Sequence, residues 1–246
     1  MRNIIRISGS DVRPFLQGLV TNDVEKLDKG LVYAALLTPQ GKYLADFFLV
    51  PQEDGSVLLD VAAFQSDALL QRLTMYKLRS DVQIEQTDMQ VQVGTGPAPD
   101  GALSDPRHAA LGWRAYHSSP VEDSGDFDAI RVAHCIPEAG IELGPDTFIL
   151  EAGLERLNGV DFKKGCYVGQ EVTARMKHKT TLRKGLVTVE VEGTATPGTP
   201  IMSRGKEAGL LHTCSGDRAI AYLRLDRASD EMQAGDAVIR YRETPA

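Results

Sequence analysis

The stretch Lys163-Lys164-Gly165-Cys166-Tyr167-Val168-Gly169-Gln170-Glu171 places one thiol among two lysines and two glycines. A thiol reacts as its thiolate, so positive charge from both lysines near Cys166 would activate it. Residues 169–176 have a composition compatible with a helix, and a helix starting there would point its free N–H groups back toward the thiol. The two glycines permit positive φ or close approach of another group. Alternatively, Cys166 is a small buried apolar residue, as free cysteines often are.

This stretch resembles the K-G-C-[FY]-x-G-Q-E signature of the YgfZ family, and it matches at every defined position. YgfZ proteins bind folate, are related to the T-protein of glycine cleavage, and act in iron–sulfur cluster assembly or repair. The resemblance implies a tetrahydrofolate-binding protein that assists assembly or repair of 4Fe–4S clusters in client enzymes. It also implies that Cys166 is the functional thiol and that Lys164, Gln170 and Glu171 belong to the same site. Arg175 fits the usual continuation of the motif.

Composition excludes several classes of protein. The chain has 246 residues, enough for one large domain or for a domain with a small companion. Its net charge of −7 argues against broad nucleic-acid binding through phosphate neutralisation. The first residues lack the apolar core of a signal peptide, and no apolar run is long enough to cross a bilayer. We therefore expect a cytoplasmic protein.

The three cysteines, Cys135, Cys166 and Cys214, are widely spaced and contain no C-x-x-C pair. This pattern does not suggest a disulfide framework. Three thiols also cannot complete the four-thiolate shell usual for an iron–sulfur cluster. A cluster handled here would have to be shared with a partner or a small thiol. The family resemblance implies that Cys166 is a ligand of such a transient cluster, shared with an A-type carrier protein.

Hydrophobic patterns predict an α+β fold in the first part of the chain. Strands are expected at residues 4–7, 31–37, 43–50, 56–61, 82–84 and 89–93, with helices capped by Ser10 or Asp11 and by Ser66 or Asp67. Residues 94–108 are rich in glycine, proline and aspartate, which predicts a flexible surface connection.

A further helix is expected from Pro145, with Ile149, Leu150, Leu154 and Leu157 inward, ending at Asn158-Gly159. Short strands separated by turns over residues 186–246 predict a small antiparallel barrel, with Cys214 in a turn. The resemblance agrees with this pattern. It implies a T-protein-like folate-binding region of antiparallel sheets with helices at residues 1–183, built from two halves joined near 94–108. The C-terminal β-barrel would occupy residues 184–246.

Other segments share motifs with T-proteins and imply folate contacts. Residues 15–24 resemble F-L-x-x-L-x-T-N-D-V, and Tyr33 aligns with a tyrosine near the T-protein folate site. Residues 137–142 resemble G-E-x-G-Y-E, whose glutamate binds the pterin ring; Glu138 takes that position, and Ile141 replaces the usual tyrosine. A carboxylate suits a pterin because it can accept two hydrogen bonds from the N–H edge. Tyr33 as a core residue and Glu138 as an exposed turn residue remain the alternatives.

One departure concerns catalysis. In T-proteins an aspartate shortly after the glycine turn is essential to aminomethyl transfer, and here Ala45 aligns with it, followed by Asp46. Because side chains alternate across a strand, a neighbour cannot replace that aspartate without a register slip. Active aminomethyl transfer is therefore not expected. Asp46 and Arg175 remain among the implied folate contacts. The competing functions are an aminomethyltransferase-like one-carbon enzyme and a folate sensor without cluster chemistry.

Residues 175–184 form the densest basic run, Arg-Met-Lys-His-Lys-Thr-Thr-Leu-Arg-Lys. Such a run is most often a solvated face. A second hypothesis is that it attracts an anion, either the glutamate tail of folate or an acidic partner surface. The family resemblance implies A-type iron–sulfur carriers and 4Fe–4S client enzymes as partners, without a membrane.

Overall fold

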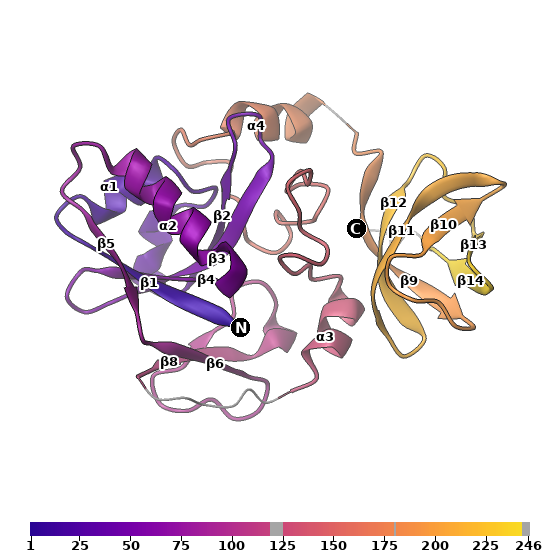
Figure 1. Cartoon of the computed structure of the whole chain (residues 1–246), viewed down its shortest axis with the longest axis horizontal. Coiled ribbons are helices and arrows are strands. Elements are labelled where there is room, and N and C mark those ends of the chain that lie inside the picture. Colours follow the sequence, from indigo (N-terminus) through magenta and orange to yellow (C-terminus); the bar gives the residue numbers. More distant parts are fainter. Residues whose placement is uncertain (119–124, 180, 243–246) are drawn as a thin grey trace. The chain divides into compact units, whose positions relative to one another are not determined.

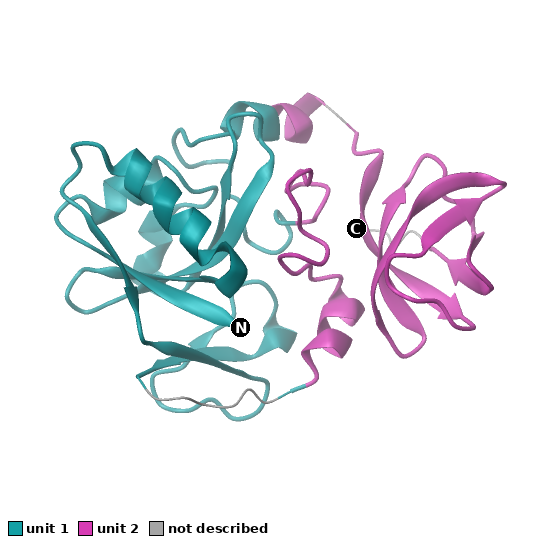
Figure 2. Ribbon diagram, in the orientation of Figure 1, with its two compact units in different colours: residues 1–125, 154–174 teal, residues 126–153, 175–246 magenta. Residues whose placement is uncertain are grey.

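The computed structural model describes residues 1–118, 125–179 and 181–242. The chain forms two compact units (Figure 2): residues 1–125 with 154–174, and residues 126–153 with 175–246. This division differs from the expected one at 183/184, because residues 126–153 belong to the same unit as the barrel. Among the described residues, no helix has the length and apolar content needed to cross a bilayer.

The first unit is built on a five-stranded antiparallel sheet in the order β2-β3-β4-β1-β5 (Figure 1). Its strands are β1 (Arg2–Ser8), β2 (Val32–Leu37), β3 (Tyr43–Pro51), β4 (Val57–Ala62) and β5 (Gln83–Thr87), which confirms the predicted strands. Side chains in β2 and β4 are buried at every position, because both faces of these strands are covered. One face packs on helices, and the other carries the polar groups described below.

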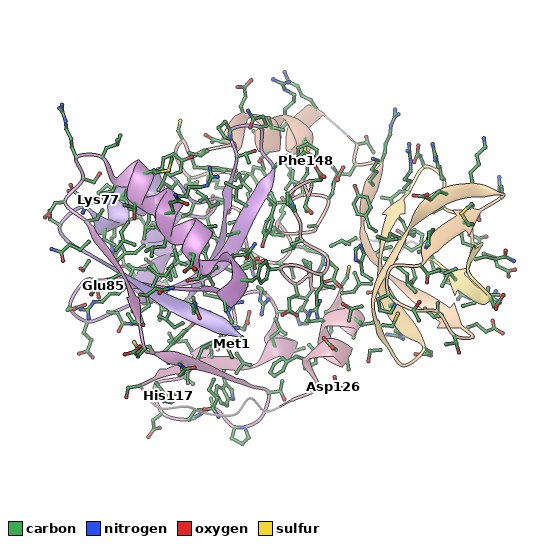
Figure 3. All side chains as sticks on the ribbon, viewed as in Figure 1. Met1, Lys77, Glu85, His117, Asp126 and Phe148 are labelled. Atoms are coloured by element: carbon green, nitrogen blue, oxygen red, sulfur yellow. The ribbon has the colours of Figure 1, made fainter. Side chains whose placement is uncertain are left out.

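The helices beside this main sheet are α1 (Val12–Gln17), the 3-10 helix η1 (Val24–Lys29) and α2 (Ala63–Lys77). Leu69 and Leu73 of α2 enter the main apolar core, and side chains fill the space between α2 and the sheet (Figure 3). The predicted cap of α2 is wrong, because this helix starts directly from β4 and Ser66 is a buried helical residue. Asp11 occupies the N-cap position of α1 as predicted, but its side chain does not bond to the helix. Its carboxylate accepts a hydrogen bond from the N–H of Asp81.

A smaller sheet in the order β6-β8-β7 completes the unit, with β6 (Gln90–Gly94), β7 (Leu103–Ser104), β8 (Trp113–His117) and the 3-10 helix η2 (Ala109–Leu111). The surface connection predicted over residues 94–108 holds for residues 95–101, which are exposed and lie outside the strands, but not for the rest of the range. Strand β7 pairs with β8 inside this range, and Asp105 is buried and paired with Arg107. Glycine and proline here mark turns between paired strands rather than a loose linker.

The second unit contains a closed barrel in the order β10-β11-β12-β9-β14-β13, as predicted (Figure 1). Its strands are β9 (Lys184–Glu192), β10 (Pro200–Ser203), β11 (Lys206–Ser215), β12 (Arg218–Arg224), β13 (Glu231–Ala234) and β14 (Ala237–Arg240). Strand β13 was not predicted. Cys214 was expected in a turn but lies in β11, which continues past a register shift between Leu211 and Cys214.

Residues 126–153 belong to this unit and begin with α3 (Phe127–His134), which the sequence did not indicate. Thr188 of β9 donates to the carbonyl of Val132 at 2.6 Å, so α3 is held on the barrel. The helix predicted from Pro145 is wrong, because residues 149–158 form successive turns. Gly153 has φ +75°, outside the helical region, at the point where the chain passes from the second unit to the first. The four apolar side chains are nevertheless buried as expected.

Helix α4 (Gln170–Lys179) confirms the helix expected after Cys166. It begins in the first unit and ends in the second, which starts at residue 175. Cys166 therefore lies four residues ahead of its first helical residue.

Candidate functional site

Cys166 lies in a segment of the first unit that we call the cysteine loop, residues 161–169. Two of its side chains, Lys164 and Tyr167, are 7% and 8% exposed, whereas Gly165 and Cys166 between them are exposed. Of the three cysteines, all within the described ranges, Cys135 is buried and Cys214 is intermediate. The fold thus presents one thiol on a two-residue bridge between buried anchors.

The first anchor is the Lys164 ammonium, which donates to the backbone carbonyls of Gln17 at 2.9 Å, Val20 at 2.5 Å and Asn22 at 2.9 Å. Burial lowers the pKa of Lys164 to about 8, and the carboxylates of Asp23 and Asp161 act in the opposite direction. The sequence pattern predicted that this lysine supplies an activating positive charge beside the thiol. In the structure its ammonium is instead bound to the segment between α1 and η1.

More hydrogen bonds join the same two segments. Thr21 donates its hydroxyl to the carbonyl of Gly159 at 2.6 Å, and its own carbonyl accepts from the N–H of Asp161 at 3.0 Å. Asn22 donates to the carbonyl of Asn158 at 2.6 Å. The structure therefore brings together two motifs that the sequence analysis treated separately, the T-N-D segment and the K-G-C segment.

Asp161 fixes the entry to the cysteine loop. Its carboxylate accepts the N–H of Lys163 at 2.7 Å and the N–H of Lys164 at 3.2 Å, and pairs with Lys26 at 2.7 Å. These contacts lower the pKa of Asp161, against the effect of its partial burial. The backbone just before the exposed bridge is therefore set by the side chain of Asp161, two and three residues earlier in the chain, rather than by regular secondary structure.

The two glycines of the motif differ. Gly169 has φ +83°, and a Cβ placed on it would lie 2.6 Å from the carbonyl oxygen of Thr38. A Cβ placed on Gly41, which has φ +75° and follows Thr38 in the β2–β3 connection, would lie 2.9 Å from the Cβ of Val172. The start of α4 therefore lies against the connection between β2 and β3 (Figure 1). Around Gly165, by contrast, a Cβ would meet no other described atom within 4 Å. The fold requires glycine at 169 but not at 165.

The remaining motif residues lie on α4. Gln170 donates its backbone N–H to the carbonyl of Tyr167, and Glu171 is exposed in the first turn, where its charge suits the helix dipole. Arg175 is exposed and belongs to the second unit. The basic residues Lys177, His178 and Lys179 are exposed in the last turn, and Thr180 lies outside the described residues. Anion binding by this run stays a prediction.

Tyr33 and Asp46 meet on the polar face of the main sheet. The hydroxyls of Tyr33 and Tyr43 donate to the two carboxylate oxygens of Asp46 at 3.0 and 2.5 Å, and Asp46 is only 4% exposed. Burial, followed by the Asp46 charge, raises the pKa of both tyrosines. Tyr33 is fully buried, so the alternative of a core residue describes it, with the addition of this hydrogen bond.

Ala45 points to the opposite face and is buried in the apolar core. Leu36 pairs with Ala45 but Leu37 pairs with Tyr43, so a register shift lies beside the position of the T-protein aspartate. In a regular strand, Tyr43 and Asp46 would face opposite sides, and the shift lets them hydrogen bond. Asp46 is thus the residue of this strand that bonds to both tyrosines, while Ala45 lies in the apolar core.

The sequence did not indicate the charged cluster beside this tyrosine pair. Asp60, with a fully buried side chain, pairs with Arg114 at 2.7 Å and also with Arg2. The Arg114 and Arg107 guanidinium groups lie 4.0 and 4.8 Å from the centre of the Phe48 ring. The arginines keep the pKa of Asp60 below its usual range although burial opposes this. One signal was available, because Asp60 is the one charged residue in the strand Val57–Ala62.

Glu138 lies in the second unit, and 55% of its side chain is exposed. It pairs with Arg131 of α3 at 2.9 Å, and Arg131 also pairs with the buried Glu142 at 2.6 Å. Glu142 further accepts the backbone N–H of Glu138 at 2.9 Å and the Thr213 hydroxyl of β11 at 2.5 Å. The segment that resembles the pterin-binding motif is thus tied to the barrel through Arg131 and Glu142, neither of which was selected from the sequence.

Metal-binding clusters and pockets are the two other kinds of possible site. Among the described residues, no group of three or more histidine, cysteine, aspartate or glutamate side chains is arranged to hold a metal. An open pocket of about 680 Å³ lies at the end of α2, lined by Asp11, Tyr76, Leu78, Arg79 and Ser80. Neither Cys166 nor Tyr33 lines it, so the folate site that the resemblance implies stays a prediction.

Comparison with known proteins adds three findings. Residues 183–245 match the family described as the CAF17 C-terminal β-barrel domain. A Mus musculus relative, "Iron-sulfur cluster assembly factor IBA57, mitochondrial", is 31% identical over 270 residues, covering 91% of this chain and 75% of the relative. A Mycosarcoma maydis homologue of the same name is 32% identical over 229 residues, covering 80% of this chain. The chain spans 57% of that relative's length.

Among solved structures, the glycine cleavage system aminomethyltransferase T from Bartonella henselae has the same fold, with a TM-score of 0.78 over 97% of this chain and 81% of that chain. Sequence identity is 14%, so this likeness concerns the fold alone. It confirms the predicted T-protein-like architecture. The expectation of a cytoplasmic protein is contradicted, because the mouse, human and Mycosarcoma maydis relatives are all named as mitochondrial proteins.

Proposed function

The chain belongs to the CAF17/IBA57 family of iron–sulfur cluster assembly factors, and on that premise we propose that it assists assembly or repair of 4Fe–4S clusters in client enzymes, with Cys166 as its working thiol. The observation that carries the proposal is the exposure of Cys166 between two buried anchors. A thiolate must reach iron directly, so an exposed cysteine on a fixed backbone suits a ligand that is offered to another protein.

The cluster in this proposal is cargo rather than a resident group. The chain has three cysteines, and Cys135 is buried, so it cannot surround a cluster by itself. An A-type carrier protein or the client enzyme would supply the other ligands. Gly165 supports such an approach, because the space around its Cα is open and no side chain there would obstruct a partner.

The test is support of 4Fe–4S enzymes in cells that lack the native protein. Cys166→Ser is expected to reduce client activity to the level of the deletion, because serine is a poor iron ligand at neutral pH. Cys214→Ser is the matched control, since its sulfur is only partly exposed within β11 and should be dispensable. Full client activity with Cys166→Ser would contradict the proposal.

We also propose that tetrahydrofolate, or a derivative of it, binds to this protein. The residues fit a folate only in part. Glu138 offers an exposed carboxylate that suits the N–H edge of a pterin. Tyr33 and Asp46 do not fit as they stand, because both are buried and their polar atoms are bonded to each other. Support for a folate site therefore rests on Glu138 and on the family's relationship to T-proteins.

A calorimetric titration with tetrahydrofolate tests this second proposal. Glu138→Gln is expected to weaken binding by roughly tenfold or more, the effect of losing a charge-assisted hydrogen bond. Asp128→Asn is the control, because Asp128 also pairs with Arg131 and is similarly exposed, at 66%. Equal folate affinity of the two variants would remove Glu138 from the site.

An aminomethyltransferase-like one-carbon enzyme is the alternative function. Ala45 disfavours it, because a buried methyl group stands where the catalytic aspartate aligns. Formation of methylenetetrahydrofolate from an aminomethyl donor would support this alternative. If no such turnover is measured while client support depends on Cys166, the alternative is excluded.

A further inference from the structure

Three backbone carbonyls in the first unit converge on one point. Gln17 ends α1, Asn22 precedes η1, and Val20 lies between them, so the chain here turns with its carbonyl oxygens inward. All three oxygens lie within hydrogen-bond distance of a single nitrogen, the Nζ of Lys164. An ammonium has three N–H donors, which matches three acceptors, whereas a planar guanidinium does not match a compact triangle of oxygens.

The position of this nitrogen along the chain matters. Residues 158–161 are already bound to the α1–η1 segment through Thr21 and Asn22, and Lys164 is the last of these contacts before the chain reaches Gly165 and Cys166. On the far side, Tyr167 is buried and its ring centre lies 5.2 Å from the same nitrogen. The ammonium, which is itself the first anchor of the exposed bridge, therefore also lies over the ring of the second.

We propose that Lys164 is a positioning residue for Cys166, acting as a built-in cation in a three-carbonyl site that would otherwise accept a small ammonium ion. This inference rests on the proposed function, because it assigns Lys164 to the thiol of that function. It separates the two lysines of the motif: Lys164 holds the loop, whereas the exposed Lys163 remains at the surface. Removing the ammonium frees residues 165–167 without changing the thiol itself.

The experiment compares Lys164→Ala, which opens the carbonyl site, with Lys164→Met, which fills the space with an uncharged chain of similar length. Client-enzyme support is measured with purified protein, together with hydrogen exchange at residues 165–167. Misplacing a reactive group by about 1 Å can lower the rate of a reaction that relies on its position about a hundredfold. We therefore expect client-enzyme support by both variants to fall at least about tenfold. Lys163→Met is the matched control and should retain full support.

Chemical rescue tests whether N–H donors at the three carbonyls, rather than the volume of the Lys164 side chain, position the thiol. Methylammonium chloride should restore support and exchange protection to Lys164→Ala, because its N–H groups can reach the three carbonyls. Tetramethylammonium, which has no N–H donor, should not restore either, and Lys164→Met should not respond to methylammonium because its side chain occupies the site. Rescue with this pattern supports the proposal. If Lys164→Ala fails to fold, restoration of its folding by methylammonium alone is the corresponding readout.

Two results would overturn the proposal. Full support by Lys164→Met would show that the ammonium is not needed to place the thiol. Loss of support with unchanged exchange at residues 165–167 would show that Lys164 acts through its charge on the thiol instead. Either result leaves the role of Cys166 intact, whereas full support by Cys166→Ser would remove the proposed function itself.

Discussion

The cysteine loop and the Glu138 segment, residues 137–142, differ in how a buried charge beside an exposed candidate residue is stabilised. Each places an exposed candidate residue, Cys166 or Glu138, close in sequence to a buried charged one, Lys164 or Glu142. The buried lysine is held by neutral backbone carbonyls, whereas the buried glutamate is held by the guanidinium of Arg131.

This difference has an energetic consequence. Removing Lys164 leaves three carbonyls that are neutral and can be solvated or rearranged. Removing Glu142 takes the buried carboxylate from Arg131 and leaves this buried cation with the exposed carboxylates of Asp128 and Glu138, which is more costly in a low-dielectric interior. The Glu138 segment should therefore depend on its charge pair for stability, while the cysteine loop should depend on Lys164 mainly for local position.

The largest effect is expected from Glu142→Ala. It leaves Arg131, itself 5% exposed, without the carboxylate at 2.6 Å, and the free energy of unfolding of the second unit should fall by about 3–5 kcal/mol. Urea denaturation followed by circular dichroism measures this change. Glu138→Gln, at an exposed pair with the same arginine, should cost about 1 kcal/mol or less. Equal losses in the two variants would contradict the distinction between buried and exposed partners.

A smaller loss is expected from Gly169→Ala in the cysteine loop. The new Cβ would combine φ +83° with a 2.6 Å approach to the carbonyl of Thr38, so unfolding should become easier by about 1–3 kcal/mol. Thermal unfolding of the first unit provides the measurement. A variant as stable as the native chain would show that the start of α4 does not rest on the β2–β3 connection as described.

The lowered pKa of Lys164 predicts a pH dependence of stability that separates Lys164 from Lys163. With a pKa of about 8 in the folded state and 10.5 ordinarily, the unfolded chain binds the proton more tightly between these values. The free energy of unfolding should therefore rise with pH across that window, by up to about 1.4 kcal/mol per pH unit from this group. Lys164→Met should lack this rise, whereas Lys163→Met should keep it. If the free energy of unfolding of the native chain and of Lys164→Met changes in parallel with pH, the lowered pKa of Lys164 is ruled out.

The smallest effect is expected from Gly165→Ala. Its Cβ enters open space and its φ is not positive, so the free energy of unfolding should stay within about 0.5 kcal/mol of the native value. The same thermal measurement applies, with Gly169→Ala as the comparison. A large loss at position 165 would mean that the exposed bridge is packed more tightly than the structure indicates.

Local patterns predicted most of the secondary structure because strands β1 to β4 and the barrel strands carry strong apolar and turn signals. They failed where tertiary structure overrides local preference. The chain over 147–158 has helical apolar spacing, yet Gly153 adopts positive φ where the chain crosses between units. The polar run 94–108 resembles a linker, yet it supplies β7 and the buried Asp105.

The sequence by itself determined that Cys166 is the candidate functional residue, because the motif and glycine spacing that mark it are formed by its immediate neighbours in the chain. It also determined the fold class, because periodicity and turn residues are local properties. Only the tertiary structure decided that Lys164 is buried, that Asp46 rather than Ala45 faces the tyrosines, and that Glu138 shares an arginine with Glu142. The burial of Lys164 depends on contacts with residues 142 to 147 positions away in the sequence. The other two facts depend on strand register and on packing against the barrel, which a side chain's own sequence neighbours do not fix.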